Sequence, residues 1–297
     1  MFSLRQKVLF KNRETLTPYL LLMPAFLIIF CLLVFPIIWN VYVAFHDVKL
    51  TNLQKEWPAI GIQNFIELFH DEYFLESLQV SVRFIGGCVI FQLCFGILLA
   101  AVLNKNLRGK EVFRALLVLP WLFSAVIVGF SWRWIYNDTF GLLNFGLRSI
   151  GMEPQAWLSS PDLAIWSIVL ANVWFGTPFS MLFMGSALTT IDQNLYEAAT
   201  VDGATKVQSF FRITLPLLKP FIATNLILIT IWTVNLFDLQ LIMTGGGPLY
   251  STTTVSLYMY RRAFQFGHLS EGAAVGLVLL CINAVVAVVY TRIMRER

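Results

Sequence analysis

The sequence predicts an all-α polytopic membrane protein with six transmembrane helices in a single membrane domain, residues 1–297. Its 297 residues are 58% hydrophobic and only 13% charged, whereas about a quarter of the residues of soluble domains are charged. Six stretches are apolar over about 20 residues or more, the length that crosses the hydrocarbon core of a bilayer. They are continuously apolar rather than alternating, so helices are expected instead of a β-barrel. The predicted spans are residues 19–45, 77–103, 113–136, 162–188, 217–243 and 272–293.

The first predicted span precedes the longest polar connection. Residues 19–45 are too long for the apolar core of a signal peptide, and no small-residue cleavage site follows them. Residues 46–76 carry six acidic residues and two lysines, which makes them too polar to span a membrane. We expect them to form an external loop with short helices at residues 63–69 and 73–78.

The positive residues orient the chain. Fourteen of the 21 Lys and Arg residues fall on one side of the membrane when the loops are assigned to alternating sides. Positive residues concentrate in cytoplasmic loops, so both termini and the connection after the fourth span are expected in the cytoplasm. The basic residues form no basic face, which argues against a nucleic-acid partner. The predicted location is the cytoplasmic (inner) membrane of a bacterium, as a multi-pass protein surrounded by membrane lipid.

A polar, helix-prone insert, residues 197–216, separates the fourth and fifth predicted spans. We expect a short helix over residues 196–204 with its stop at Gly203, because glycine accepts the left-handed conformation that ends many helices. Pro216 and Pro220 suit the first turn of the next helix, where an amide N–H has no partner within the helix. The carboxylates of the insert are free to meet a partner.

The spacing of this insert resembles the cytoplasmic loop by which the membrane subunits of bacterial binding-protein-dependent ABC importers dock onto their ATPases. A Glu-Ala-Ala triplet is followed after three residues by Gly, and after nine more by Ile-x-Leu-Pro. The resemblance implies that residues 194–212 form a coupling loop, with Glu197 and Asp202 making polar contacts and Gly203 the turn. An ordinary amphipathic interhelical loop is the alternative. The residues assigned to ATPase coupling are Glu197, Ala198, Ala199, Asp202, Gly203, Ile213, Leu215 and Pro216.

The rest of the chain resembles the sugar-transporting branch of these importers, specifically the maltose-type (MalF-like) subunit that contacts the sugar. Residues from about 77 to the C-terminus carry the resemblance, which implies the type I ABC importer permease fold with a core region at residues 77–294. The matching residues are Leu103-Asn104, Arg108-Gly109, Phe113-Arg114, Leu119-Pro120, residues 172–179, residues 244–248, residues 252–254, Tyr258, Tyr260 and Ala263-Phe264.

The resemblance also implies a substrate path. Sugars are held by aromatic faces and by polar groups that pair their hydroxyls. Gly176 and Pro178 lie in a region that matches an unwound helix, with a plain proline kink as the alternative. Ile229 and Thr233 depart from the polar residues usual at their positions. Asp238 is an acid inside a predicted span and a functional candidate, with an exposed or Arg-paired structural role as the alternative. The substrate-path residues are Trp121, Asn172, Phe175, Gly176, Phe179, Ile229, Thr233, Asn235 and Asp238.

The partners and cofactors follow from the same resemblance. The chain carries no Walker sequence, so ATP and Mg are expected on partner ATPase subunits, with no cofactor and no enzymatic activity in this subunit. The histidines and cysteines fit no metal-ligand spacing, and no metal is expected. The implied partners are a second, distinct permease subunit in a heterodimer, two ATPase subunits and an extracytoplasmic solute-binding protein. The turn at Gly245-Gly246-Gly247 is expected to lead into a loop that meets the binding protein.

The predicted function is binding-protein-dependent, ATP-driven import of a sugar or sugar-like solute by alternating access. Glycerol phosphodiesters or another polar solute are alternative cargoes. A membrane enzyme acting on lipid-linked substrates would show clustered His or acidic residues at one interface, and an ion-coupled carrier would show paired intramembrane charges or inverted repeats. The sequence has no such cluster, and only Asp238 is available for a charge pair.

Overall fold

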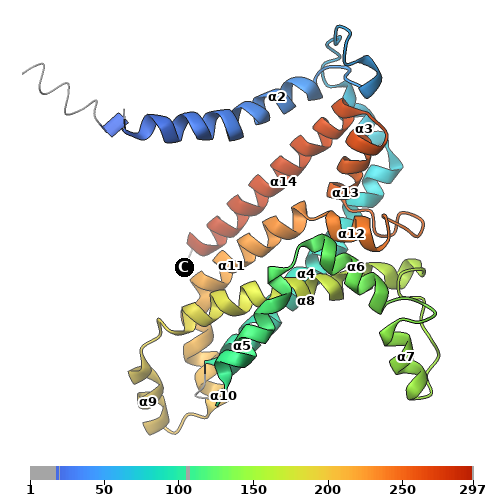
Figure 1. Ribbon diagram of the computed structural model, residues 1–297. Helices are drawn as coiled ribbons and strands as arrows, with labels where there is room; N and C mark the ends of the chain where they lie inside the picture. Colours follow the sequence, from blue (N-terminus) through green and yellow to red (C-terminus); the bar gives the residue numbers. More distant parts are fainter. Residues whose placement is uncertain (1–17, 20, 105–107, 296–297) are drawn as a thin grey trace, which may run out of the picture.

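The computed structural model describes residues 18–19, 21–104 and 108–295, and these are mostly helical (Figure 1). The basic segment 1–17, which was expected in the cytoplasm, lies outside the described residues. In chain order the elements are η1 (Phe30–Val34), α2 (Phe35–Ala44), η2 (Leu50–Asn52), α3 (Gln63–His70), α4 (Glu72–Leu103), α5 (Lys110–Val118), η3 (Leu119–Leu122), α6 (Ala125–Ile135), α7 (Leu142–Ser149), α8 (Pro161–Leu188), α9 (Gln193–Val201), α10 (Lys206–Ser209), η4 (Phe210–Thr214), α11 (Leu215–Asn235), α12 (Asp238–Met243), α13 (Val255–Tyr260), η5 (Arg261–Gln265) and α14 (Leu269–Arg295).

The all-α polytopic fold class is confirmed. Within the described ranges, five helices are long and apolar enough to cross a membrane, and a bent pair of helices makes a sixth if it counts as one span. The five are Leu21–Ala44, Glu72–Leu103, Pro161–Leu188, Lys206–Asn235 and Leu269–Arg292. The short helix expected at residues 63–69 is present as α3.

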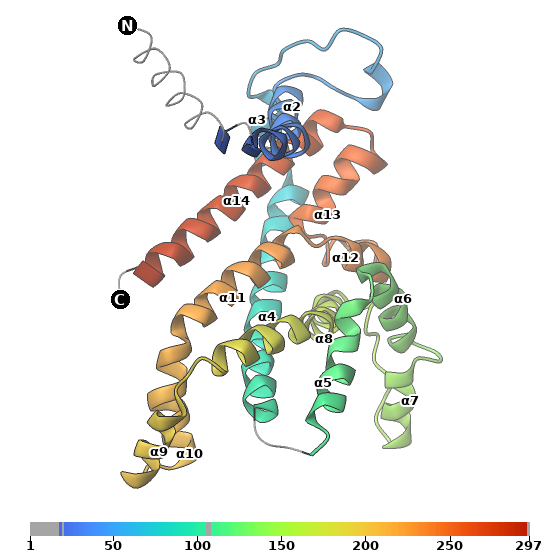
Figure 2. The same cartoon turned by 60° about the vertical axis from the view of Figure 1, so that its left-hand side comes forward.

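The prediction of a continuous third span over residues 113–136 is wrong. The helical segments Lys110–Leu122 and Ala125–Ile135 meet at an angle of 100°, and Figure 2 shows α5 and α6 on either side of the bend. Phe123 and Ser124 have extended backbones, with ψ of 156° and 151°. The Ser124 hydroxyl accepts a hydrogen bond from the Ile127 amide at 3.4 Å, so it starts α6 as a new helix.

The fifth span also differs from the prediction, at both ends. The helical span begins at Lys206, but α11 within it begins at Leu215, so Pro216 lies in the first turn of α11 as predicted while Pro220 lies inside that helix. The π-helical turn η4 ends at Thr214, two residues before Pro216, and such a turn relaxes the backbone hydrogen-bond ladder where proline has no N–H to donate. At the other end Leu236 has an extended backbone, and α12 forms separately.

Two further expectations are corrected. Residues 73–78 belong to the long helix α4, because the Asp71 carboxylate accepts hydrogen bonds from the Tyr73 and Phe74 amides and caps its first turn. The region of residues 172–179 is not unwound, since α8 continues through Pro178 as one 28-residue helix.

Close packing of α4 against α8 forms the centre of the fold. A Cβ atom built on Gly96 would lie 2.4 Å from the Ser180 Cβ, so the two helices touch where glycine leaves room. Phe84 and Ile168 are fully buried in the same interface region. The Ser180 hydroxyl also donates to the Asn225 side chain at 3.4 Å, which joins α8 to α11.

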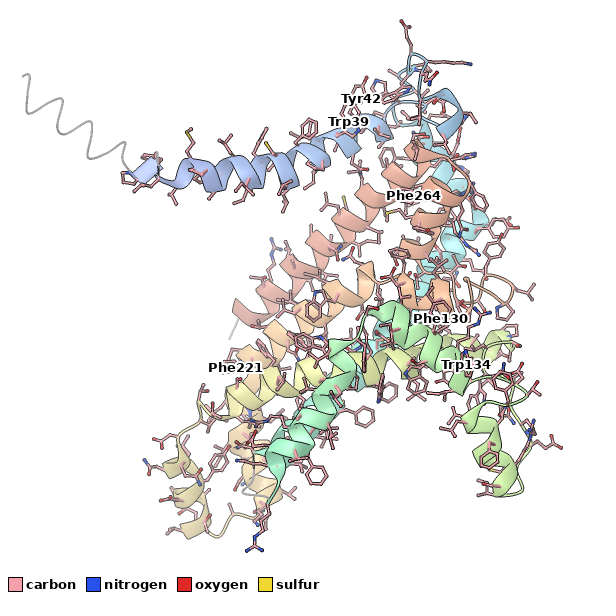
Figure 3. The ribbon with its side chains drawn as sticks, viewed as in Figure 1. Trp39, Tyr42, Phe130, Trp134, Phe221 and Phe264 are labelled. Atoms are coloured by element: carbon pink, nitrogen blue, oxygen red, sulfur yellow. The ribbon has the colours of Figure 1, made fainter. Side chains whose placement is uncertain are left out.

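The part of the first span, Leu21–Ala44, that precedes α2 stands away from the other helices (Figure 1). Helix α2 packs on the start of α14 through Val43 and Ala44, which form a small core with Ala273 and Ala274. The labelled side chains of Trp39 and Tyr42 lie near this junction in Figure 3, and the rings stack with centroids 5.5 Å apart. The remainder of this apolar helix is open to lipid or to another membrane helix.

Candidate functional site

The connection between the fourth and fifth spans is a compact, well-capped structure. Asp192 caps α9 by accepting a hydrogen bond from the Asn194 amide at 2.9 Å. Gly203, with φ of 78°, ends the helix, and the Gly203 and Ala204 amides donate to the Thr200 and Ala199 carbonyls. The helix thus starts three residues before the predicted position and stops at the predicted glycine.

The second half of this connection turns directly into the fifth span. Thr205 and Gln208 form a reciprocal capping box, with hydrogen bonds of 2.8 and 3.3 Å. The hydroxyls of Tyr196 on α9 and Thr214 on η4 are 2.8 Å apart, and Thr214 is buried. This bond joins α9 to η4 at the base of the fifth span.

The predicted coupling residues include exposed residues and residues that line a hollow in the loop. Glu197, Ala198 and Asp202 are exposed, and neither acid forms an ion pair within the described part of the chain. A hollow of about 390 Å³ separates the two arms of the loop. Its lining includes Ala199, Asp202, Gly203 and Ile213. Leu215 is half-buried and Pro216 exposed at the start of α11.

Removing the Tyr196 hydroxyl tests whether the loop moves with the helix. The Tyr196→Phe variant keeps the ring but loses the bond to Thr214, which costs about 1 kcal/mol. We expect hydrogen exchange of the α9 amides to become about fivefold faster, with unchanged exchange in α8. The matched control is Thr200→Val, which removes a hydroxyl bonded only within α9. Equal exchange in Tyr196→Phe and the unmodified protein would contradict this role.

The predicted substrate-path residues are not all on one surface. Phe179 on α8 lies between Trp121 on η3 and Trp232 on α11, with ring centroids 5.9 and 4.7 Å away. Trp121 and Trp232 are 37% and 54% exposed. This aromatic cluster of Trp121, Phe179 and Trp232 presents ring faces at the surface where three elements meet. Trp232 was not among the residues predicted from the sequence, although Trp232 lies one position before Thr233 on the same helix.

Three other predicted path residues lie toward the core. The Gln92 side chain donates to the Asn172 carbonyl at 3.1 Å, and a Cβ on Gly176 would clash with Gln92 at 2.7 Å. These contacts place Asn172 and Gly176 in the interface of α4 with α8. Phe175 packs beside them on the main hydrophobic cluster. The Asn172 side-chain nitrogen is buried without a hydrogen-bond partner.

The remaining path residues lie on α11 and at its end. Ile229 and Thr233 are buried, and the Thr233 hydroxyl donates to the Ile229 carbonyl at 2.6 Å. Asn235 pairs with Asn283 of α14, with distances of 3.5 and 3.3 Å. Asp238 is half-buried at the start of α12, where a carboxylate interacts favourably with the helix dipole.

A second polar cluster, which the sequence reading missed, lies at the opposite end from α9. Arg262 contacts the carboxylates of both Asp71 and Glu271, and the Tyr258 hydroxyl donates to Asp71 at 2.7 Å. His268 is bonded to Glu271 at 2.6 Å. The cluster joins the start of α4 to η5 and the start of α14. Asp71 and Arg262 are 191 residues apart, so no local sequence pattern predicts this ion pair.

The Asp71 cluster predicts an acid-sensitive contribution to stability. Burial raises the pKa of Asp71, but the Tyr258 hydrogen bond, the Arg262 charge and two backbone amides together hold it below its usual range. Because the pKa of Asp71 is lower in the folded state, its ionised form stabilises the fold at pH values above the unfolded-state pKa of about 4. This stabilisation is lost as the pH falls through the lower, folded-state pKa. Compared with Asp71→Asn, the unmodified protein should be about 1.5–3 kcal/mol more stable at pH 7. Thermal unfolding in detergent should show that this advantage shrinks steadily below pH 4.

Comparison with known proteins identifies the family. The model of the family described as "Binding-protein-dependent transport system inner membrane component" matches residues 92–296. The trehalose/maltose transport system permease protein MalF of Thermococcus litoralis is 34% identical over 97% of this chain and 96% of its own length. The sulfoquinovosyl glycerol transport system permease protein SmoG of Agrobacterium fabrum is 35% identical over 96% of this chain and 92% of its own.

A solved structure supports the same assignment. A bacterial ABC transporter involved in the import of the acidic polysaccharide alginate has a chain that superposes with a TM-score of 0.84. That chain is 26% identical, and the match covers 97% of this chain and 98% of the other. The present chain therefore belongs to the inner-membrane components of binding-protein-dependent transport systems, and it is a multi-pass permease subunit of an ABC importer.

Proposed function

We propose that this permease carries a saccharide or glycoside and that the aromatic cluster of Trp121, Phe179 and Trp232 contacts it. The names of the two relatives and of the similar solved transporter all refer to solutes with glycosyl units. Ring faces of this kind pack on the C–H surfaces of sugars. The observation that carries the proposal is the cluster of partly exposed, mutually tilted rings contributed by η3, α8 and α11.

The charge of the path favours a neutral glycan over a glycerol phosphodiester. A phosphate would be bound most strongly by Arg or Lys in a water-poor site. The nine predicted path residues include no basic residue, and their one charged side chain is the acid Asp238. The two arginines near the end of the path, Arg261 and Arg262, are already bonded to Gly245 and to the Asp71 cluster.

The energy for transport comes, in this proposal, from partner subunits acting on the coupling loop, residues 194–212. Two ATPase subunits bind ATP and Mg and receive α9, and a second, distinct permease completes the path. A solute-binding protein delivers the cargo on the outer side. The caps of α9 and the bond from Tyr196 to Thr214 support this assignment, because they join the loop to the base of the fifth span. The exposed part of the first span, Leu21–Ala44, offers a surface to the second permease.

Removing one ring of the aromatic cluster tests the proposed cargo. Phe179→Ala removes the ring between the two tryptophans, and loss of such a stacking contact corresponds to about a tenfold weaker interaction. We expect the half-saturating concentration for saccharide uptake to rise by that factor in vesicles containing the complete transporter. Trp134→Ala, on an exposed position of α6 (Figure 3), is the control and should leave it unchanged. Equal half-saturating concentrations for the two variants would mean that the cluster does not line the substrate path.

A further inference from the structure

We propose that a groove bounded by α4, α5 and α8 binds one anionic phospholipid of the cytoplasmic leaflet, with Arg114 holding its phosphate. Two adjoining cavities form this groove. One, here called the polar cavity, is lined by four polar side chains among apolar residues and lies at the end where α4 and α8 finish and α5 begins. The other is apolar and extends along α5. Met181 lines both cavities, so they lie next to each other.

The polar cavity has the chemistry of a phosphate site. It encloses about 170 Å³ and is lined by Asn104, Arg114, Ser186 and Thr189 among others. Arg114 has one ion-pair partner within the described residues, Glu111, at 3.4 Å. That carboxylate is 69% exposed, and such surface pairs contribute little. The guanidinium is therefore available to bind a phosphate through two parallel hydrogen bonds.

The second cavity has the chemistry of an acyl-chain site. It encloses about 540 Å³, and its lining is apolar apart from Thr177. Its lining comes from three helices: Phe95 and Leu99 of α4, Leu117 of α5 and Trp174 of α8 are among its residues. A sugar would leave its hydroxyls unpaired against such a surface, which is costly. The groove therefore does not suit the cargo proposed above.

The length of the groove matches one leaflet. Arg114 lines the polar cavity and Phe123 lines the far end of the apolar one. The helical rise between them is about 14 Å, close to half of the roughly 30 Å hydrocarbon thickness. Arg108 and Lys110 lie at the same end as Arg114 and add positive charge there. Basic pockets between transmembrane helices on the cytoplasmic side are suited to anionic headgroups.

The test measures lipid binding to the full chain in its assembled transporter. After delipidation in detergent, the complex is titrated with phosphatidylglycerol or phosphatidylcholine of identical acyl chains, and bound lipid is counted by native mass spectrometry. Both lipids carry the phosphate, but the choline of phosphatidylcholine also places a positive charge beside Arg114, Arg108 and Lys110. We therefore expect phosphatidylglycerol to bind about tenfold more tightly, a difference of about 1.4 kcal/mol. Arg114→Gln should lower its affinity to that of phosphatidylcholine. Lys219→Gln removes an exposed charge at the end of α11 that shares the predicted cytoplasmic side, and should change nothing.

A second variant separates the acyl-chain site from the phosphate site. Leu117→Trp fills the apolar cavity and should weaken both lipids while Arg114 is intact. The proposal is overturned if the unmodified transporter binds both lipids equally or if Arg114→Gln retains the preference. It is also overturned if inorganic phosphate at millimolar concentration displaces the lipid, which would indicate a site for free phosphate. If lipid binds only when the second permease subunit is absent, that subunit occupies the groove, and the proposal is contradicted.

Discussion

Replacing Gly203 by valine is expected to uncouple ATP hydrolysis from uptake while membrane insertion stays normal. Gly203 has φ of 78°, a conformation that costs a residue with a side chain about 1–2 kcal/mol and a β-branched one more. Nothing lies within 4 Å of a Cβ at this position, so the strain comes from the backbone alone. It disrupts the turn between α9 and α10, and uptake should fall about tenfold or more. Uptake and ATPase rates in reconstituted vesicles measure the effect.

A matched substitution at the same position separates backbone strain from bulk. Asparagine adopts the left-handed conformation several times more readily than other residues with a side chain. Gly203→Asn should therefore keep most of the uptake. If Gly203→Val transports normally, α9 does not act as a lever, and if Gly203→Asn fails as severely as valine, the side chain rather than the backbone conformation is responsible.

Replacing Gly96 by leucine is expected to destabilise the whole subunit. The Cβ of any larger residue would lie 2.4 Å from the Ser180 Cβ and 3.0 Å from the Ser180 backbone carbon. Rigid backbone cannot yield, so α4 and α8 must separate and the core around Phe84 opens. Overpacking of this kind costs about 1–3 kcal/mol or more. The thermal midpoint of the purified protein should fall by several degrees, as expected for such a loss.

A control on the same helix isolates the helix contact. A Cβ atom added to Gly86 of α4 would have no neighbouring atom within 4 Å. Gly86→Leu should therefore leave the thermal midpoint almost unchanged. An equal loss in both variants would mean that glycine flexibility in α4, rather than its contact with α8, determines stability.

The membrane spans could be predicted from sequence because they depend on the length and continuity of apolar stretches. The breaks within these spans could not be predicted from the sequence. Ser124 starts a new helix inside an apolar stretch, while Pro220 and Pro178 lie within continuous helices. A proline is tolerated when neighbouring turns and helices satisfy the freed carbonyl groups. That outcome depends on tertiary packing, which the local sequence does not specify.

The candidate sites show the same division. The helix stop at Gly203 is local and was predictable. Contacts between distant segments were not predictable. Phe179 meets Trp232 because α8 and α11 pack together, and Asp71 meets Arg262 across most of the chain. For the same reason, the sequence could not show that Asn172 and Gly176 face α4.

The central claim is tested most directly by measuring on which side of the membrane α9 lies. Val201 is 89% exposed on α9, and a Val201→Cys variant in a cysteine-free background reports its accessibility to a membrane-impermeant maleimide. We expect labelling in inside-out vesicles stripped of the ATPase subunits, protection when those subunits are added back, and no labelling in right-side-out vesicles. Labelling from the outside, or labelling that the ATPase subunits leave unchanged, would contradict the proposal that this loop receives their movement.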